Sequence, residues 1–103
     1  MNNWKRQHDK IMAARKEMSL FFKELRLAGL RVLYVSDPWT LEDQSIVDIL
    51  DPTNHFFLIK FLCDDGVFVV EWGDRGRKLQ GRTRWETTEE VMQEIRRVVV
   101  ALT

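Results

Sequence analysis

The chain has 103 residues, of which 45% are hydrophobic and 31% are charged. This length and composition are typical of one globular domain with a single core, so we expect one domain over residues 1–103. The 16 basic and 16 acidic residues cancel to a formal net charge of zero, so no global field favours nucleic acid or an anionic membrane as the partner.

Residues 4–28 show the apolar spacing of an amphipathic helix. The heptad positions are Trp4, Ile11, Met18 and Leu25, with Ala14, Phe21 and Ala28 three residues after the last three of these. Gly29 follows as a natural C-cap. About 25 residues make a helix of about 38 Å, which is longer than a domain of this size is wide. We therefore predict that residues 1–12 project into solvent or meet a second copy, which would make a homodimer through this helix.

Residues 30–36, with the sequence LRVLYVS, predict a short strand that ends at Asp37-Pro38. The next segment has two interpretations. Thr40 as an N-cap, followed by acidic residues in the first turn, favours a helix over residues 40–50. The alternative is a strand over residues 45–50. We favour the helix because its cap and acidic first turn have a physical mechanism.

Residues 55–72 predict a β-hairpin, with strands over 55–63 and 67–72 joined at Asp65-Gly66. If these two residues form the loop, Lys60 faces Glu71, which is a favourable cross-strand pair. A three-residue loop is rejected because it would move Glu71 to the apolar face. That face consists of Phe57, Ile59, Phe61, Cys63, Phe68, Val70 and Trp72.

Residues 77–85 predict a third strand of the same meander, after a turn over residues 73–76. Pairing Trp72 with Arg77 places Lys78 opposite Glu71, so that a charged row crosses the outer face. Gly81 is predicted to mark a bulge or a close approach of another group. The residues assigned to the core face are Leu79, Thr83 and Trp85.

Thr87-Thr88-Glu89-Glu90 is a capping box that predicts a helix running to the C-terminus. Its apolar residues at helical spacing are Val91, Ile95, Val98, Val99 and Leu102. The predicted fold is an α+β two-layer sandwich in the order α-β-(α)-β-β-β-α. Its antiparallel sheet has three to four strands, and the two long terminal helices pack on the apolar face.

No set of residues in the sequence has the spacing of a catalytic or metal site. His8 and His55 lie far apart and have no further ligand nearby, so we interpret them as structural or solvent-facing. The acids of the middle segment are interpreted as helix-start and turn acids rather than as a Mg²⁺ or acid–base site. They are Asp37, Glu42, Asp43, Asp48 and Asp51. We expect no enzymatic activity, no metal and no cofactor.

Cys63 is the single cysteine, which excludes an internal disulfide and a cysteine-based zinc cluster. The N-terminus alternates charged and apolar residues and does not resemble a signal peptide. No apolar run approaches the ~20 residues of a membrane span. We therefore expect a reducing compartment, the cytoplasm, and no membrane partner.

Basic residues gather around the third strand, with Asp74 as the single nearby acid. They are Arg75, Arg77, Lys78, Arg82 and Arg84. Such charges protect an edge strand from aggregation, and they also suit an acidic protein surface or phosphates. Trp39, in a loop outside the core pattern, either anchors a partner or packs over the sheet end.

The functional hypothesis is a small non-catalytic interaction module that docks on an acidic partner through the arginine-rich strand and the mixed outer sheet face. In size and charge distribution it is comparable to inhibitor-like proteins such as toxin-immunity proteins or phage-encoded antagonists, an analogy of size alone. The alternative is a nucleic-acid-binding protein that uses the same strand and the basic face of the first helix. That face carries Lys5, Arg6, Lys10, Arg15 and Lys16.

Overall fold

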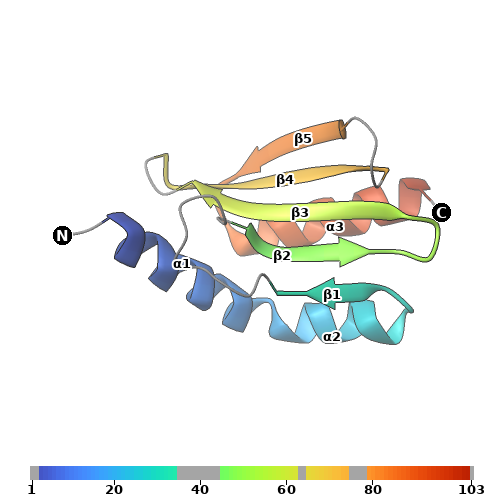
Figure 1. Cartoon of the computed structure of the whole chain (residues 1–103), viewed down its shortest axis with the longest axis horizontal. Coiled ribbons are helices and arrows are strands. Elements are labelled where there is room, and N and C mark those ends of the chain that lie inside the picture. The colour runs from blue at the N-terminus through green and yellow to red at the C-terminus, as the bar shows by residue number, and fades with distance from the viewer. Residues whose placement is uncertain (1–2, 35–44, 63–64, 75–78, 103) are drawn as a thin grey trace.

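The structure is a computed structural model that describes residues 3–34, 45–62, 65–74 and 79–102. Figure 1 shows three helices and five strands. In chain order they are α1 (Asn3–Glu17), α2 (Ser19–Leu27), β1 (Arg31–Leu33), β2 (Ser45–Leu50), β3 (His55–Leu62), β4 (Val67–Asp74), β5 (Leu79–Trp85) and α3 (Thr88–Leu102).

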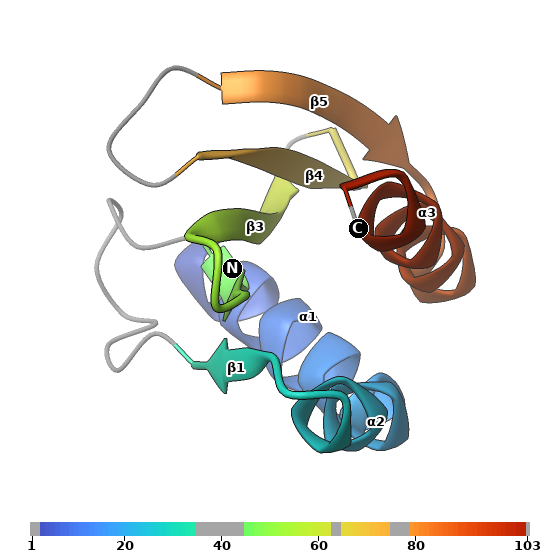
Figure 2. The ribbon, with the colours of Figure 1, turned by 90° about the vertical axis from the view of Figure 1, so that its right-hand side faces the viewer.

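The strands form one antiparallel sheet in the order β1-β2-β3-β4-β5. All three helices lie on one side of this sheet (Figure 2). We call the helix-covered side the inner face and the opposite side the outer face. One apolar cluster fills the space between the helices and the inner face. The predicted α+β two-layer class is confirmed, with five strands in place of three to four.

The fifth strand is β2, which replaces part of a predicted helix. The helix prediction is wrong for residues 45–50, and the strand alternative is correct; residues 40–44 lie outside the described residues. Ile46, Val47 and Ile49 have exposed fractions of 0%, and β-branched residues fit a pleated surface well. A register irregularity between Ser45 and Val47 explains how two consecutive residues are both buried. Packing against β3 therefore outweighs the helix-start signal.

The predicted N-terminal helix is divided at Met18 into α1 and α2, while hydrogen bonds continue across the division. The amide of Met18 donates to the carbonyl of Ala14 (3.0 Å), and the amide of Phe22 donates to that of Met18 (2.9 Å). Met18 is fully buried, and Ile11 is 1% exposed. From Ile11 to Leu25 the heptad packs within one chain, so the homodimer stays a prediction that must rest on the part of the helix before Ile11.

Gly29 ends α2 in the predicted capping role. Its φ of +95° is left-handed, a region that glycine enters at little cost. The amide of Leu30 donates to the carbonyl of Leu25 and that of Gly29 to Arg26, both at 3.0 Å, which is a Schellman motif. Strand β1 follows at once but covers only Arg31–Leu33 of the predicted 30–36; residues 35 and 36 lie outside the described residues.

The β3–β4 hairpin has the predicted faces but a different register. Leu62 pairs with Val67, so the connection spans residues 63–66 and not Asp65-Gly66 alone. A slip of two residues leaves each side chain on the same face. Phe57, Ile59, Phe68 and Val70 are therefore buried in the core as predicted; Cys63 and the side chain of Phe61 lie outside what the structure describes.

The predicted charged row across the outer face is wrong. Lys60 pairs with Val69, and Glu71 pairs with Leu58 on one side and Arg82 on the other. Glu71 is only 6% exposed and its neighbour Val69 is 0% exposed, so β4 is buried on both faces. The sequence pattern alone does not distinguish registers that differ by an even number of residues.

The pairing of β5 with β4 is also shifted from the prediction, because Trp72 pairs with Gly81 and not with Arg77. A register irregularity between Trp72 and Gly73 confirms the bulge predicted near Gly81. Leu79, assigned to the core from the sequence, is 45% exposed. Trp85, also assigned to the core face, packs against the core as predicted.

Helix α3 begins at the predicted capping box. The amide of Thr87 donates to Glu90 Oε1 (3.1 Å), and the amide of Glu90 donates to Thr87 Oγ1 (3.2 Å). Val91, Ile95 and Val98 are buried against the sheet, which confirms the predicted apolar face. Among the described helices, none has both the length and the apolar character needed to cross a membrane.

Candidate interaction surface on strand β5

Strand β5 is one of the two edge strands of the sheet and carries two of the predicted basic residues. Gly81 and Thr83 pair with Trp72 and Val70, whose side chains belong to the inner face. Strand alternation therefore places Arg82 and Arg84 on the outer face, and both side chains are exposed. We call Arg82, Arg84 and the unpaired edge of this strand the β5 surface.

The structure brings together only part of the predicted partner-binding set. Arg82 and Arg84 are neighbours on one side of β5. Arg75, Arg77, Lys78 and Trp39 lie outside the described residues, so their part in the surface stays a prediction.

Arg84 is partly neutralised by a residue far away in the sequence. Its Nη2 donates to Asp65 Oδ2 at 2.7 Å, and both side chains are about half exposed. An exposed pair of this kind contributes about 0–1 kcal/mol. The pair ties β5 to the turn between β3 and β4 without removing Arg84 from solvent. Sequence reasoning missed it because it depends on the register of two hairpins.

Arg82 lies beside a different acid from Arg84. In the register it lies opposite the buried Glu71. Within the described part of the chain, no side chain forms an ion pair or a hydrogen bond with the Arg82 guanidinium. Its charge is therefore available to an incoming group.

The inner side of β5 is packed tightly, which fixes the strand. The Trp72 indole lies against the Gly81 backbone, because a Cβ built at Gly81 would be 2.1 Å from Trp72 Cζ2. This confirms the predicted close approach at Gly81. Trp85 Nε1 donates to Thr83 Oγ1 at 2.7 Å. Only the outer side and the free edge of β5 are left for a partner.

A polar network closes the β2–β3 turn and holds the neighbouring end of β4. The ring of His55 is close to a carboxylate at both nitrogens, with Nδ1 3.1 Å from Asp51 Oδ2 and Nε2 3.0 Å from Asp74 Oδ1. Gln80 Nε2 donates to Asp74 Oδ2 at 3.2 Å, which extends the network to the start of β5. Its members come from the β2–β3 turn and from three strands, so no local pattern in the sequence indicates it.

Asp51 is the centre of this network. Its Oδ1 accepts hydrogen bonds from the amides of Thr53 (2.9 Å) and His55 (2.8 Å) and from the Thr53 hydroxyl (2.9 Å). Burial raises the pKa of Asp51, but the hydrogen bonds from the His55 amide, the Thr53 side chain and the His55 ring more than offset it, so the pKa lies below the usual 3.8. The carboxylate therefore works as a turn acid, as predicted.

This network is interpreted as structural rather than catalytic. Both His55 nitrogens are used by carboxylates, which leaves neither for a metal. No group of three His, Cys, Asp or Glu side chains within the described ranges is placed to hold a metal ion. The structural reading of His55 therefore fits its surroundings.

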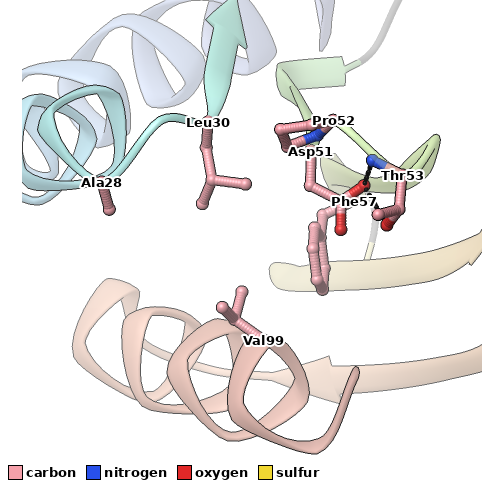
Figure 3. A pocket seen from close by; sticks show the side chains of 7 residues that line it. All are labelled: Ala28, Leu30, Asp51, Pro52, Thr53, Phe57 and Val99. Atoms are coloured by element: carbon pink, nitrogen blue, oxygen red, sulfur yellow. Dashed lines mark hydrogen bonds between the residues drawn. The ribbon is translucent and has the colours of Figure 1, made fainter. Parts of the chain in front are cut away.

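A cavity of about 510 Å³ opens between the ends of α2 and α3, beneath the β2–β3 turn (Figure 3). Its lining is mainly apolar and consists of Ala28, Leu30, Asp51, Pro52, Thr53, Phe57 and Val99. The one carboxylate in it, Asp51, already accepts hydrogen bonds from Thr53 and His55. The lining therefore holds no arrangement for acid–base or nucleophilic chemistry.

The comparisons with known proteins add no functional information to this geometry. No family model matches the chain, and no curated protein or solved structure gives a significant match.

Proposed function

We propose that the protein is a small non-catalytic interaction module that docks on an acidic protein partner through the β5 surface. The observation that carries the proposal is the pair of exposed arginines at alternate positions of an edge strand, one of which, Arg82, forms no ion pair or hydrogen bond with the described side chains. Opposite charges across such a contact mainly raise the association rate and fix the orientation of the partner.

The docking surface is narrower than the sequence suggested. Val69 and Glu71 on the outer face of β4 are buried, so the centre of that face is not free for contact. The contact is therefore limited to β5 and the residues next to it. A module of this size would act as an inhibitor or antagonist by occupying its partner's surface, and we propose the cytoplasm as its location.

A differential capture experiment tests the proposal. The wild-type chain, R82E/R84E and a matched control, K5E/K10E, are immobilised and exposed to lysate of the source cells at low salt. Both variants change the formal charge equally, and Lys5 and Lys10 are exposed side chains of α1, which covers the inner face of the sheet, whereas Arg82 and Arg84 lie on the outer face. We expect the wild type and K5E/K10E to retain acidic proteins that R82E/R84E does not retain.

The purified retained protein then gives the quantitative test. Charge reversal at β5 should slow association at low salt by about tenfold, and this difference should shrink as salt is added. Equal retention by all three proteins would contradict the proposal. The alternative nucleic-acid-binding function would be favoured if the wild type retained nucleic acid, if both variants retained less of it, and if this binding weakened steeply as salt is added.

A further inference from the structure

We infer that β5 binds its partner by strand addition: an extended acidic segment pairs with the free edge of β5 and continues the sheet. The inference rests on the proposed function and adds to it the conformation and the residue pattern of the partner segment.

First, strand β5 has a hydrogen-bonding edge with which no other described strand pairs. It is the last strand in the sheet order and pairs with β4 alone. In an antiparallel pair, about half of the backbone N–H and C=O groups of the outer strand point away from its neighbour. Figure 1 shows no described element beside that edge. Such an edge is a template for another strand.

The second step is that the edge is held in an extended conformation before binding. The register is continuous from Phe68–Trp85 to Trp72–Gly81, and the Trp72 ring lies directly on the Gly81 backbone. A strand fixed in this way loses little conformational freedom when a partner pairs with it. The irregularity at Gly73 limits regular pairing to the part of β5 from Gly81 onward.

The third step is that the side chains select the partner's charge. Arg82 and Arg84 lie two residues apart on the same side of the sheet. Residues at alternate positions of an added strand would stand beside them. Asp or Glu at those positions would pair with both arginines, whereas Lys or Arg would repel them.

The same charges argue against a second copy as the occupant. If two β5 strands paired antiparallel about Thr83, Arg82 of each copy would lie directly opposite Arg84 of the other. Like charges in directly opposite positions are destabilising. The arginines therefore block self-association at the edge while they favour an acidic segment.

The test uses a synthetic nine-residue probe, acetylated and amidated, with Thr and Glu alternating (TETETETET). In an extended strand its four glutamates share one side, and successive amides point to opposite edges. Two further versions carry backbone N-methyl groups, either at the glutamates or at the internal threonines. A scrambled peptide of the same composition is the control for charge alone.

We expect the alternating probe to bind the wild-type chain more tightly than the scrambled peptide, and R82E/R84E to abolish this binding. N-methylation of one set of residues should weaken binding about tenfold or more, since it blocks the edge that faces β5. The other set should be tolerated. Amide-exchange NMR should show slower exchange at alternate residues of β5 when the probe is bound.

Failure of the inference and failure of the proposed function give different results. If the probe binds through the arginines but both methylated versions bind equally well, charge docking stands and strand addition is refuted. Absence of binding to the alternating probe at low salt also refutes strand addition, while the capture experiment still decides the proposed function. If the free chain formed dimers in which the β5 amides that point away from β4 were already protected from exchange, the edge would belong to a second copy and the inference would be overturned.

Discussion

Replacing Gly81 with alanine gives a sharp test of how β5 is held. An added Cβ would lie 2.1, 2.4 and 2.7 Å from Cζ2, Cε2 and Cη2 of the Trp72 ring. Ordinary contact begins near 3.4 Å, so the nearest ring atom must move by about 1.3 Å, the difference between those two distances. Trp72 packs against the core, so its ring cannot move without disturbing its neighbours.

The informative result is whether G81A raises or lowers the free energy of unfolding. Overpacking of this kind costs about 1–3 kcal/mol, whereas alanine in an unobstructed strand position stabilises by about 0.5–1 kcal/mol relative to glycine. We therefore expect G81A to lower the free energy of unfolding by about 1–2 kcal/mol. In a chain of this size, that lowers the Tm by about 5–10 °C.

Urea unfolding followed by tryptophan fluorescence and circular dichroism measures the change, and a double-mutant cycle with W72L assigns it. W72L removes the ring and is itself destabilising by about 2–4 kcal/mol. In the W72L background, the G81A change should become neutral or stabilising. A G81A chain as stable as the parent, or more stable, would refute the contact between the indole and the β5 backbone.

Three further predictions follow from the described contacts. D51N should destabilise by about 1–2 kcal/mol at neutral pH, because hydrogen bonds to a charged acceptor are the stronger ones. Since the folded-state pKa of Asp51 is lowered from 3.8, this stabilisation is present above pH 3.8 and is lost as the pH falls through the folded-state pKa. If the urea midpoints of the wild type and D51N differed by the same amount at pH 7 and at pH 2, this prediction would be contradicted. T87A should lower the free energy of unfolding by about 1 kcal/mol through loss of the capping box, as measured by thermal unfolding. T88A is the control, because it removes only an exposed side-chain hydrogen bond to Glu17. Equal losses of stability in T87A and T88A would argue against the cap. R82E/R84E should lower the free energy of unfolding by no more than about 2 kcal/mol, because Arg84 loses only an exposed ion pair and a negative side chain at position 82 would lie opposite Glu71 in the register; a much larger loss would give both arginines a structural role.

The faces of β3 and β4 were predictable from the sequence, but the pairing of these strands was not. Alternation in β3 and β4 placed Phe57, Ile59, Phe68 and Val70 correctly in the core. Registers that differ by two residues preserve that alternation, so Lys60 and Glu71 were wrongly placed opposite each other. In the observed register, His55 pairs with Asp74 at the far end of the hairpin, and their side chains meet at 3.0 Å.

Local signals succeeded where the structure depends on neighbours in the chain. Gly29 and the Thr87–Glu90 capping box mark helix ends as predicted, because those hydrogen bonds span only a few residues. The signal at Thr40 failed for residues 45–50, since Ile46, Val47 and Ile49 gain more from burial in the sheet.

The candidate site was predictable only in part. Alternation along β5 indicated that Arg82 and Arg84 point outward, and both are exposed. The ion pair with Asp65 and the burial of Glu71 depend on hairpin registers, which the sequence does not encode locally. Because Glu71 is buried, the surface available to a partner is limited to β5 and does not extend over the whole outer face.

Hydrogen exchange of the chain with and without its captured acidic partner tests whether β5 is the interaction surface. We expect that binding slows exchange at backbone amides of residues 79–85 and that R82E/R84E removes this protection. Protection confined to α1 or to β1, with exchange in β5 unchanged, would contradict the assignment of β5 as the interaction surface.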